Sequence, residues 1–67
     1  MNSKKIQKLE KIKEEIGNLS LPQDQKSSSF KHIEEWYAQD QSFGVLYEKL
    51  AQISPKIEAL LAEMGLI

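Results

Sequence analysis

The sequence predicts an all-α fold: a three-helix bundle in a single domain over residues 1–67, whose last helix is long and is kinked or split at Ser54-Pro55. Apolar residues recur at steps of three and four over long stretches, which is the period of a helix with one buried face. Glycine, proline and serine separate these stretches, as they do between helices. No stretch carries a strand pattern. A chain of 67 residues forms one domain at most.

The first helix is expected over about residues 3–17. A short apolar seam runs along one side of it: Leu9, Ile12, Ile16 and Leu19. Gly17-Asn18 supplies the stop, because glycine commonly follows the last helical residue. Three lysines share another side of this helix at steps of four and three: Lys4, Lys8 and Lys11.

The second helix is expected over about residues 29–39, with an earlier start at Pro22 as the alternative. The serines and aspartate of residues 18–29 favour a connector, because they compete with a helix by bonding their own backbone. Pro22 at a first helical position would instead start the helix early. The apolar face of the second helix has four members: Phe30, Ile33, Trp36 and Tyr37.

The third helix is expected over about residues 42–64, after a short polar turn that Asp40 or Ser42 caps. Its apolar seam keeps the spacing of a coiled coil without a slip: Phe43, Leu46, Leu50, Ile53, Ile57, Leu60 and Met64. Ser54 as an N-cap, with Pro55 as the first helical residue, would divide this stretch into two helices. One helix kinked near residues 51–55 is favoured, because a turn would usually reset the seam.

The end of the last helix follows a recognisable pattern. Gly65 after Met64 is expected in the left-handed conformation that closes a helix. Leu66 would then contact Leu61, as in a Schellman motif. Because Leu66 and Ile67 are both apolar, we expect this segment to dock on the bundle.

Composition and charge exclude several classes of protein. The chain has no Cys and a single histidine, so it lacks the residues for a disulfide or for a His- or Cys-ligated metal site. No apolar run is long enough to cross a membrane, and no apolar segment follows the positive residues 1–5 as in a secretory signal. We therefore expect a cytoplasmic protein with no cofactor, no metal and no membrane contact.

No group of residues indicates catalysis, and we do not expect an enzyme. His32 could pair with Glu35, but acid–base or metal chemistry needs further partners, so a surface histidine is the favoured interpretation. Glu34 and Glu35 with Asp40 are expected on a solvated face, where paired carboxylates serve no catalytic role.

The sequence favours a small structural or regulatory protein-interaction module that self-associates. Two short helices would leave part of the Phe43–Met64 seam uncovered, and monomers seldom expose such an apolar stripe. An antiparallel second copy would cover it and bury Trp36 or Tyr37 at the centre, so a homodimer is expected, with a larger protein as a further partner. The expected interface residues are Trp36, Tyr37, Phe43, Leu46, Leu50, Ile53, Ile57, Leu60 and Met64.

The alternative is a small nucleic-acid-associated regulator of the antitoxin or phage type, using Lys4, Lys8 and Lys11. Residues 1–13 hold five lysines against Glu10 alone, whereas the other 54 residues hold four lysines and nine acids. Arginine, which recognises guanine and phosphate through two hydrogen bonds, is absent. This balance disfavours nucleic acid as a partner.

The layout resembles a family of short, uncharacterised bacterial helical proteins. The resemblance rests on residues 9–15, Tyr47-Glu48, Ser54-Pro55 and residues 64–67, which match a Leu/Glu-rich opening helix, an aromatic and acidic stretch, a Pro-led last segment and a Met-Gly-Ile-like terminus. Ser54 stands where that family usually has a histidine, and the middle of this chain is shorter. The resemblance implies a helical fold and nothing about chemistry.

Overall fold

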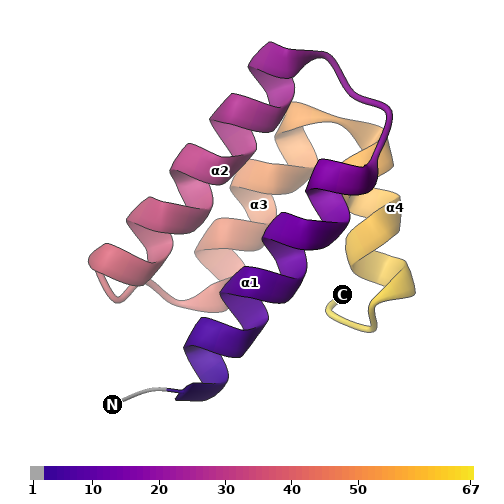
Figure 1. The fold of residues 1–67 in the computed structure, drawn as a ribbon. Helices are drawn as coiled ribbons and strands as arrows, with labels where there is room; N and C mark the ends of the chain where they lie inside the picture. The colour runs from indigo at the N-terminus through magenta and orange to yellow at the C-terminus, as the bar shows by residue number, and fades with distance from the viewer. Residues whose placement is uncertain (1–2) are drawn as a thin grey trace.

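The computed structural model describes residues 3–67 and is helical throughout, with no strand in that range. The helices are α1 (Ser3–Asn18), α2 (Gln23–Ala38), α3 (Phe43–Ile53) and α4 (Pro55–Glu63). Figure 1 shows α1 and α2 side by side, with α3 behind them and α4 beside the C-terminal part of α1. The all-α class is confirmed, but the prediction of three helices is wrong, since the described chain forms four.

α2 starts well before residue 29, so the expected connector is mostly helical. Pro22 is the N-cap residue, with a ψ angle of 148°, and its carbonyl accepts hydrogen bonds from the backbone amides of Gln25 and Lys26. The serines do not oppose the helix here. Ser29 is fully buried and its Oγ donates to the Gln25 carbonyl at 2.8 Å, so its hydroxyl bonds within the helix.

A lysine from α2 stabilises the end of α1. Lys26 Nζ donates to the Gly17 carbonyl at 3.0 Å, which gives a partner to one of the carbonyls that a helix leaves free at its C-terminus. Lys56 of α4 makes a similar bond to the Ser20 carbonyl at 3.1 Å in the following loop. These bonds hold the α1–α2 loop against both neighbouring helices.

The long last helix is divided at Ser54, so the favoured kinked helix is wrong and the two-helix alternative is correct. Ser54 is extended, with φ −160° and ψ 139°, and its Oγ accepts a hydrogen bond from the Lys56 amide at 3.2 Å. Pro55 is the first residue of α4, where its missing N–H leaves no hydrogen bond unmade. The seam gives no sign of the break, because Ile53 and Ile57 remain four residues apart across it.

The expected helix stop after Met64 is confirmed. Gly65 has φ +75°, its amide donates to the Ala62 carbonyl, and the Leu66 amide donates to the Leu61 carbonyl at 3.0 Å. These are the two hydrogen bonds of a Schellman motif. The docking of the last residues is only partial, because Leu66 packs against the core whereas Ile67 is 57% exposed.

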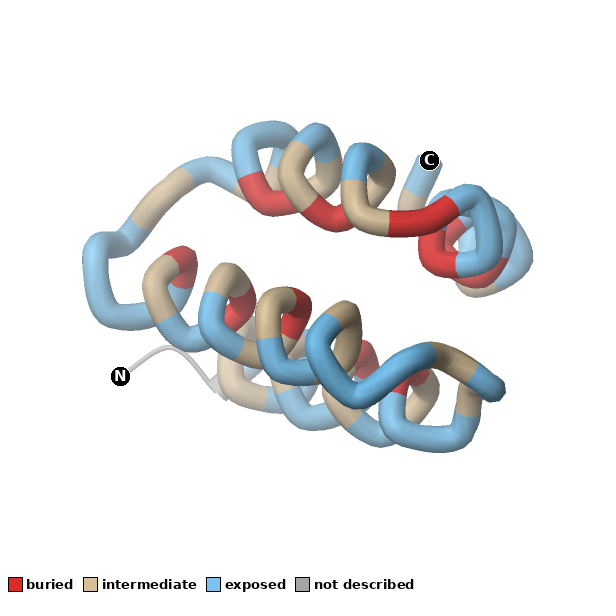
Figure 2. The backbone as a smooth tube through the Cα atoms, turned by 90° about the horizontal axis from the view of Figure 1, so that it is seen from above, coloured by how far each residue is buried: buried red, intermediate tan, exposed pale blue. Residues whose placement is uncertain are grey.

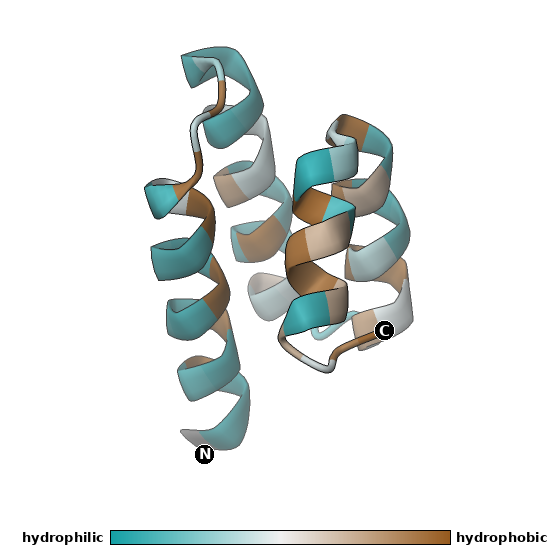
Figure 3. Cartoon of the chain, turned by 90° about the vertical axis from the view of Figure 1, so that its right-hand side faces the viewer, coloured by the Kyte–Doolittle hydropathy of each residue, from teal (hydrophilic) through white to brown (hydrophobic). Residues whose placement is uncertain are grey.

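All four helices contribute to one core. Figure 2 shows two layers, α1 with α2 and α3 with α4, whose buried segments lie on the sides that face each other. Figure 3 shows the hydrophobic side of α1 turned toward the other helices. The buried apolar residues are Ile12, Ile16, Ile33, Trp36, Leu46, Leu50, Ile57, Leu60 and Leu61. The break at Ser54 lets α4 fold back beside α1, so a single chain covers the seam that a straight helix would have exposed.

Candidate binding pocket

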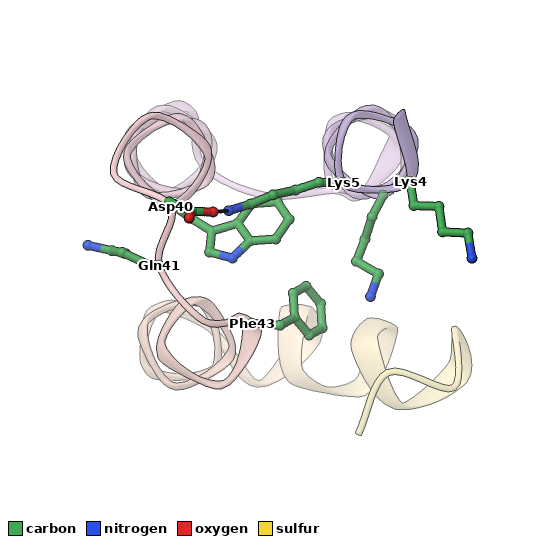
Figure 4. Close-up of a pocket in the computed structure, with 7 residues that line it drawn as sticks. Lys4, Lys5, Asp40, Gln41 and Phe43 are labelled. Atoms are coloured by element: carbon green, nitrogen blue, oxygen red, sulfur yellow. Dashed lines mark hydrogen bonds and ion pairs between the residues drawn. The ribbon is translucent and has the colours of Figure 1, made fainter. Parts of the chain in front are cut away.

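The candidate site is a cavity of about 300 Å³ at the N-terminal end of α1. We call it the basic–aromatic pocket. Figure 4 shows Lys5 reaching toward Asp40, and Phe43 pointing from α3 toward α1 and α2. Lys4 lies at the outer edge of the cavity (Figure 4). Its lining comes from α1, from the end of α2, from the α2–α3 turn and from the start of α3: Lys4, Lys5, Lys8, Trp36, Asp40, Gln41 and Phe43.

The helical hairpin explains why residues so distant in sequence meet. α1 and α2 run antiparallel, so the first turns of α1 lie against the last turn of α2. Asp40 follows α2 with φ 52°, and the Gln41 amide donates to the Trp36 carbonyl at 3.0 Å, which closes the helix with a second Schellman-type turn. This turn brings Phe43 back toward Trp36.

Lys5 and Asp40 form the polar wall of the pocket. Lys5 Nζ lies 2.9 Å from Asp40 Oδ1 and 4.7 Å from the centre of the Trp36 ring. The Lys5 side chain is only 11% exposed, whereas that of Asp40 is 93% exposed. The ammonium is therefore held between a carboxylate and an aromatic face, while the aliphatic stem is buried.

Trp36 and Phe43 form the apolar wall, and Tyr47 packs against Phe43 outside the lining. The Phe43 ring meets Trp36 edge-on at 5.6 Å between centroids and lies 4.6 Å from Tyr47. Lys8 Nζ lies 4.4 Å from the centre of the Phe43 ring. Trp36 Nε1 and the Tyr47 hydroxyl are buried with no hydrogen-bond partner among the described residues, and burial raises the pKa of the Tyr47 phenol above its usual value.

The structure places the expected interface residues in the core, in the pocket and on the surface. Leu46, Leu50, Ile57 and Leu60 are core residues, and Ile53 and Met64 are half-buried against that core. Trp36 and Phe43 line the pocket, and Tyr37 is 39% exposed on the surface. The seam is therefore interior packing, and an interface through its buried residues would require the chain to unfold.

The expected lysine row is also divided. Lys4 and Lys8 line the pocket, but Lys11 forms an ion pair with Glu15 at 3.3 Å on the same helix. Two further residues of the pocket, Lys5 and Gln41, were not expected from the sequence. Lys5 lies beside the row in sequence, and its partner Asp40 is 35 residues away, so no local pattern could have joined them.

The candidate catalytic groups do not gather. His32 Nδ1 lies 3.4 Å from Glu35 Oε1, Glu34 lies 3.4 Å from Lys13, and Asp40 pairs with Lys5 instead. Within residues 3–67, no three His, Asp or Glu side chains are placed to share a metal ion. No helix in this range has the length and apolar character needed to cross a membrane.

Comparisons with protein-family models, curated proteins and solved structures found no match for this chain. The resemblance to the family of short bacterial helical proteins therefore stays a prediction.

Proposed function

We propose that the protein is a small structural or regulatory interaction module that contacts a partner protein through the basic–aromatic pocket. The observation that supports this most is the meeting of Trp36 and Phe43 with Lys4 and Lys8 around one cavity. Partly enclosed aromatic rings dominate the binding energy of many protein interfaces, and charged groups at the rim steer the partner and fix its orientation.

The expected self-association needs a different basis from the one that the sequence offers. The sequence predicts a homodimer because the Phe43–Met64 seam would be uncovered, whereas Leu46, Leu50 and Ile57 are fully buried within one chain. The homodimer stays an untested expectation from the sequence alone, and the burial of the seam within one chain favours a monomer instead.

The proposal is tested by affinity capture from the native cell lysate with three forms of the protein. Lys4→Gln/Lys8→Gln removes two charges from the pocket, and Lys31→Gln/Lys49→Gln removes two charges elsewhere. A partner captured by the wild type and by the second variant, but lost with the first, would support the pocket as the contact. A partner captured equally by all three forms would contradict it.

Nucleic acid is the second candidate, and the observation in its favour is that Lys4 and Lys8 are exposed and carry no ion pair with a described residue. Against it, the ion pair between Lys11 and Glu15 interrupts the row, and the chain has a net charge of −1. Binding to generic duplex DNA should be titrated against salt, since binding to phosphates weakens steeply as salt rises. We expect no binding at moderate salt. Tight, salt-sensitive binding that Lys4→Gln/Lys8→Gln abolishes would favour this candidate instead.

A further inference from the structure

The free chain already holds a carboxylate in the basic–aromatic pocket. Asp40 Oδ1 lies 2.9 Å from Lys5 Nζ, and that ammonium lies over the Trp36 ring. Its φ of 52° belongs to the left-handed region, where glycine is unstrained and aspartate is tolerated at a cost. A strained residue at the edge of a cavity is a reason to look for a role, and here the strain is accompanied by a carboxylate bound to the pocket wall.

The pocket retains more positive charge than Asp40 neutralises. Three lysines and one aspartate line it, which leaves an excess of two positive charges. Lys4 and Lys8 form no ion pair with any residue in 3–67, and the Lys8 ammonium lies over the Phe43 ring rather than on an acid. The two lysines are one helical turn apart, so both can reach one acidic segment.

The apolar wall contains a hydrogen-bond donor that has no acceptor within residues 3–67. Trp36 Nε1 is a buried donor with no acceptor among the described residues, although the Trp36 side chain lines the cavity. A buried donor without a partner is destabilising, and a bound acceptor that reached it would remove that penalty. The pocket therefore combines an excess of cations with aromatic surface, and a buried unpaired donor belongs to one of its lining side chains.

We propose that the basic–aromatic pocket binds an acidic peptide segment of a partner protein. A carboxylate of that segment meets the ammonium groups of Lys4 and Lys8, and an apolar neighbour packs on the exposed part of Phe43. The proposal rests on the proposed interaction function and names the chemistry of the partner. Electrostatic complementarity of this kind sets orientation and specificity at protein interfaces.

A peptide fits the surroundings better than a nucleic acid. A phosphate backbone needs a row of cations, and this row stops after Lys8 because Lys11 pairs with Glu15. Asp40 and its exposed carboxylate at the edge of the cavity would also repel a polyanion more strongly than a peptide with one or two acidic side chains. A peptide with one or two acidic side chains needs only the two lysines that are available.

The single tryptophan of the chain makes the pocket directly observable, because Trp36 gives the only indole N–H resonance. The probe is a capped peptide with two adjacent glutamates between leucines, compared with the same peptide carrying glutamines. We expect the glutamate peptide to shift the indole N–H resonance saturably, and the glutamine peptide to leave it unchanged.

Three variants locate the binding. Lys4→Gln/Lys8→Gln should weaken binding of the glutamate peptide by about tenfold, at roughly threefold for each exposed ion pair. Asp40→Asn should tighten it by about threefold, because a negative charge is removed from the edge of the pocket and asparagine still tolerates the left-handed conformation. Lys31→Gln/Lys49→Gln should bind as the wild type does. Circular dichroism confirms that each variant is folded.

Several results would overturn the proposal. Equal binding of the two peptides would show that charge is not recognised, and full binding by Lys4→Gln/Lys8→Gln would place the peptide elsewhere. A shift of the indole resonance by a short DNA duplex at lower concentration than by the glutamate peptide would assign the pocket to nucleic acid. If captured partners depend on the pocket lysines while the glutamate peptide does not bind, the acidic ligand is wrong and the interaction function stands.

Discussion

Ser54 shows how one residue determines the path of the chain. Its side chain is buried at the junction of α3 and α4, and its Oγ accepts the hydrogen bond from the Lys56 amide. The amide groups of the first turn of a helix have no partners within the helix, so a buried helix start depends on such a bond. The sequence contains the information for this cap in the pair Ser54-Pro55, but the unbroken seam favours the wrong alternative.

The Ser54 cap can be tested against a second N-cap serine that makes no such bond. Ser42 precedes α3 with an extended backbone, and its side chain makes no capping hydrogen bond. We expect Ser54→Ala to lower the free energy of unfolding by about 1 kcal/mol and Ser42→Ala to change it by a few tenths at most. Urea denaturation measures both. Equal losses would show that the Ser54 hydroxyl has no special role.

At the scale of the element, helix ends are predictable where their chemistry is local. Gly65 and the two hydrogen bonds of the Schellman turn follow from the order Met64-Gly65-Leu66 alone. The start of α2 is not predictable in the same way, because the choice between helix and connector depends on the burial of Ser29 against the bundle. Tertiary packing decides such polar segments, and local propensity does not.

The glycines at two helix ends should respond to alanine with opposite signs. Gly65 has φ +75°, and a Cβ added there would meet no atom within 4 Å, so Gly65→Ala should cost about 1 kcal/mol through backbone strain alone. Gly44 lies within α3 with equally open space, so Gly44→Ala should stabilise the protein by about 0.5 kcal/mol. The melting temperatures of the two variants, compared with that of the wild type, test both predictions. A gain at Gly65 would contradict the left-handed turn.

Pro55 allows a test of the break between α3 and α4. It is exposed and lies at the first position of α4, where an alanine amide would have no partner within the helix. We expect Pro55→Ala to change the free energy of unfolding by less than about 1 kcal/mol, because the Ser54 cap remains. A loss of several kcal/mol in urea denaturation would mean that the proline ring packs as a core residue.

At the scale of the whole molecule, apolar spacing predicts the core but not the pocket. The all-helical class and most core positions follow from apolar spacing, and Ile12, Ile33, Leu50 and Ile57 all lie where that spacing puts them. The basic–aromatic pocket does not follow from it, because Lys5 and Asp40 are 35 residues apart and meet only once the α1–α2 hairpin forms. The expectation of a homodimer depends on an exposed Phe43–Met64 seam, and the folding of α4 beside α1 buries the centre of that seam within one chain.

The state of association gives a prediction at this scale. Because the seam is buried within one chain, we expect sedimentation equilibrium at micromolar concentration to give the single-chain mass of 7.7 kDa. The melting temperature should then be independent of protein concentration. A two-chain mass, with a melting temperature that rises with concentration, would restore the homodimer. Its contact would then lie on exposed apolar side chains such as Tyr37 and Val45 rather than on the seam.

Leu50→Glu separates the same alternatives by folding. Leu50 is fully buried in the core, and an unpaired carboxylate there costs several kcal/mol, which is most of the stability of so small a domain. We expect this variant to be unfolded by circular dichroism at every concentration, whereas Gln52→Glu, exposed on the same helix, should fold normally. A Leu50→Glu variant that folds as a monomer would mean that the seam is an interface between chains and not the interior of one, and the basic–aromatic pocket, which depends on that packing, would have to be abandoned with it.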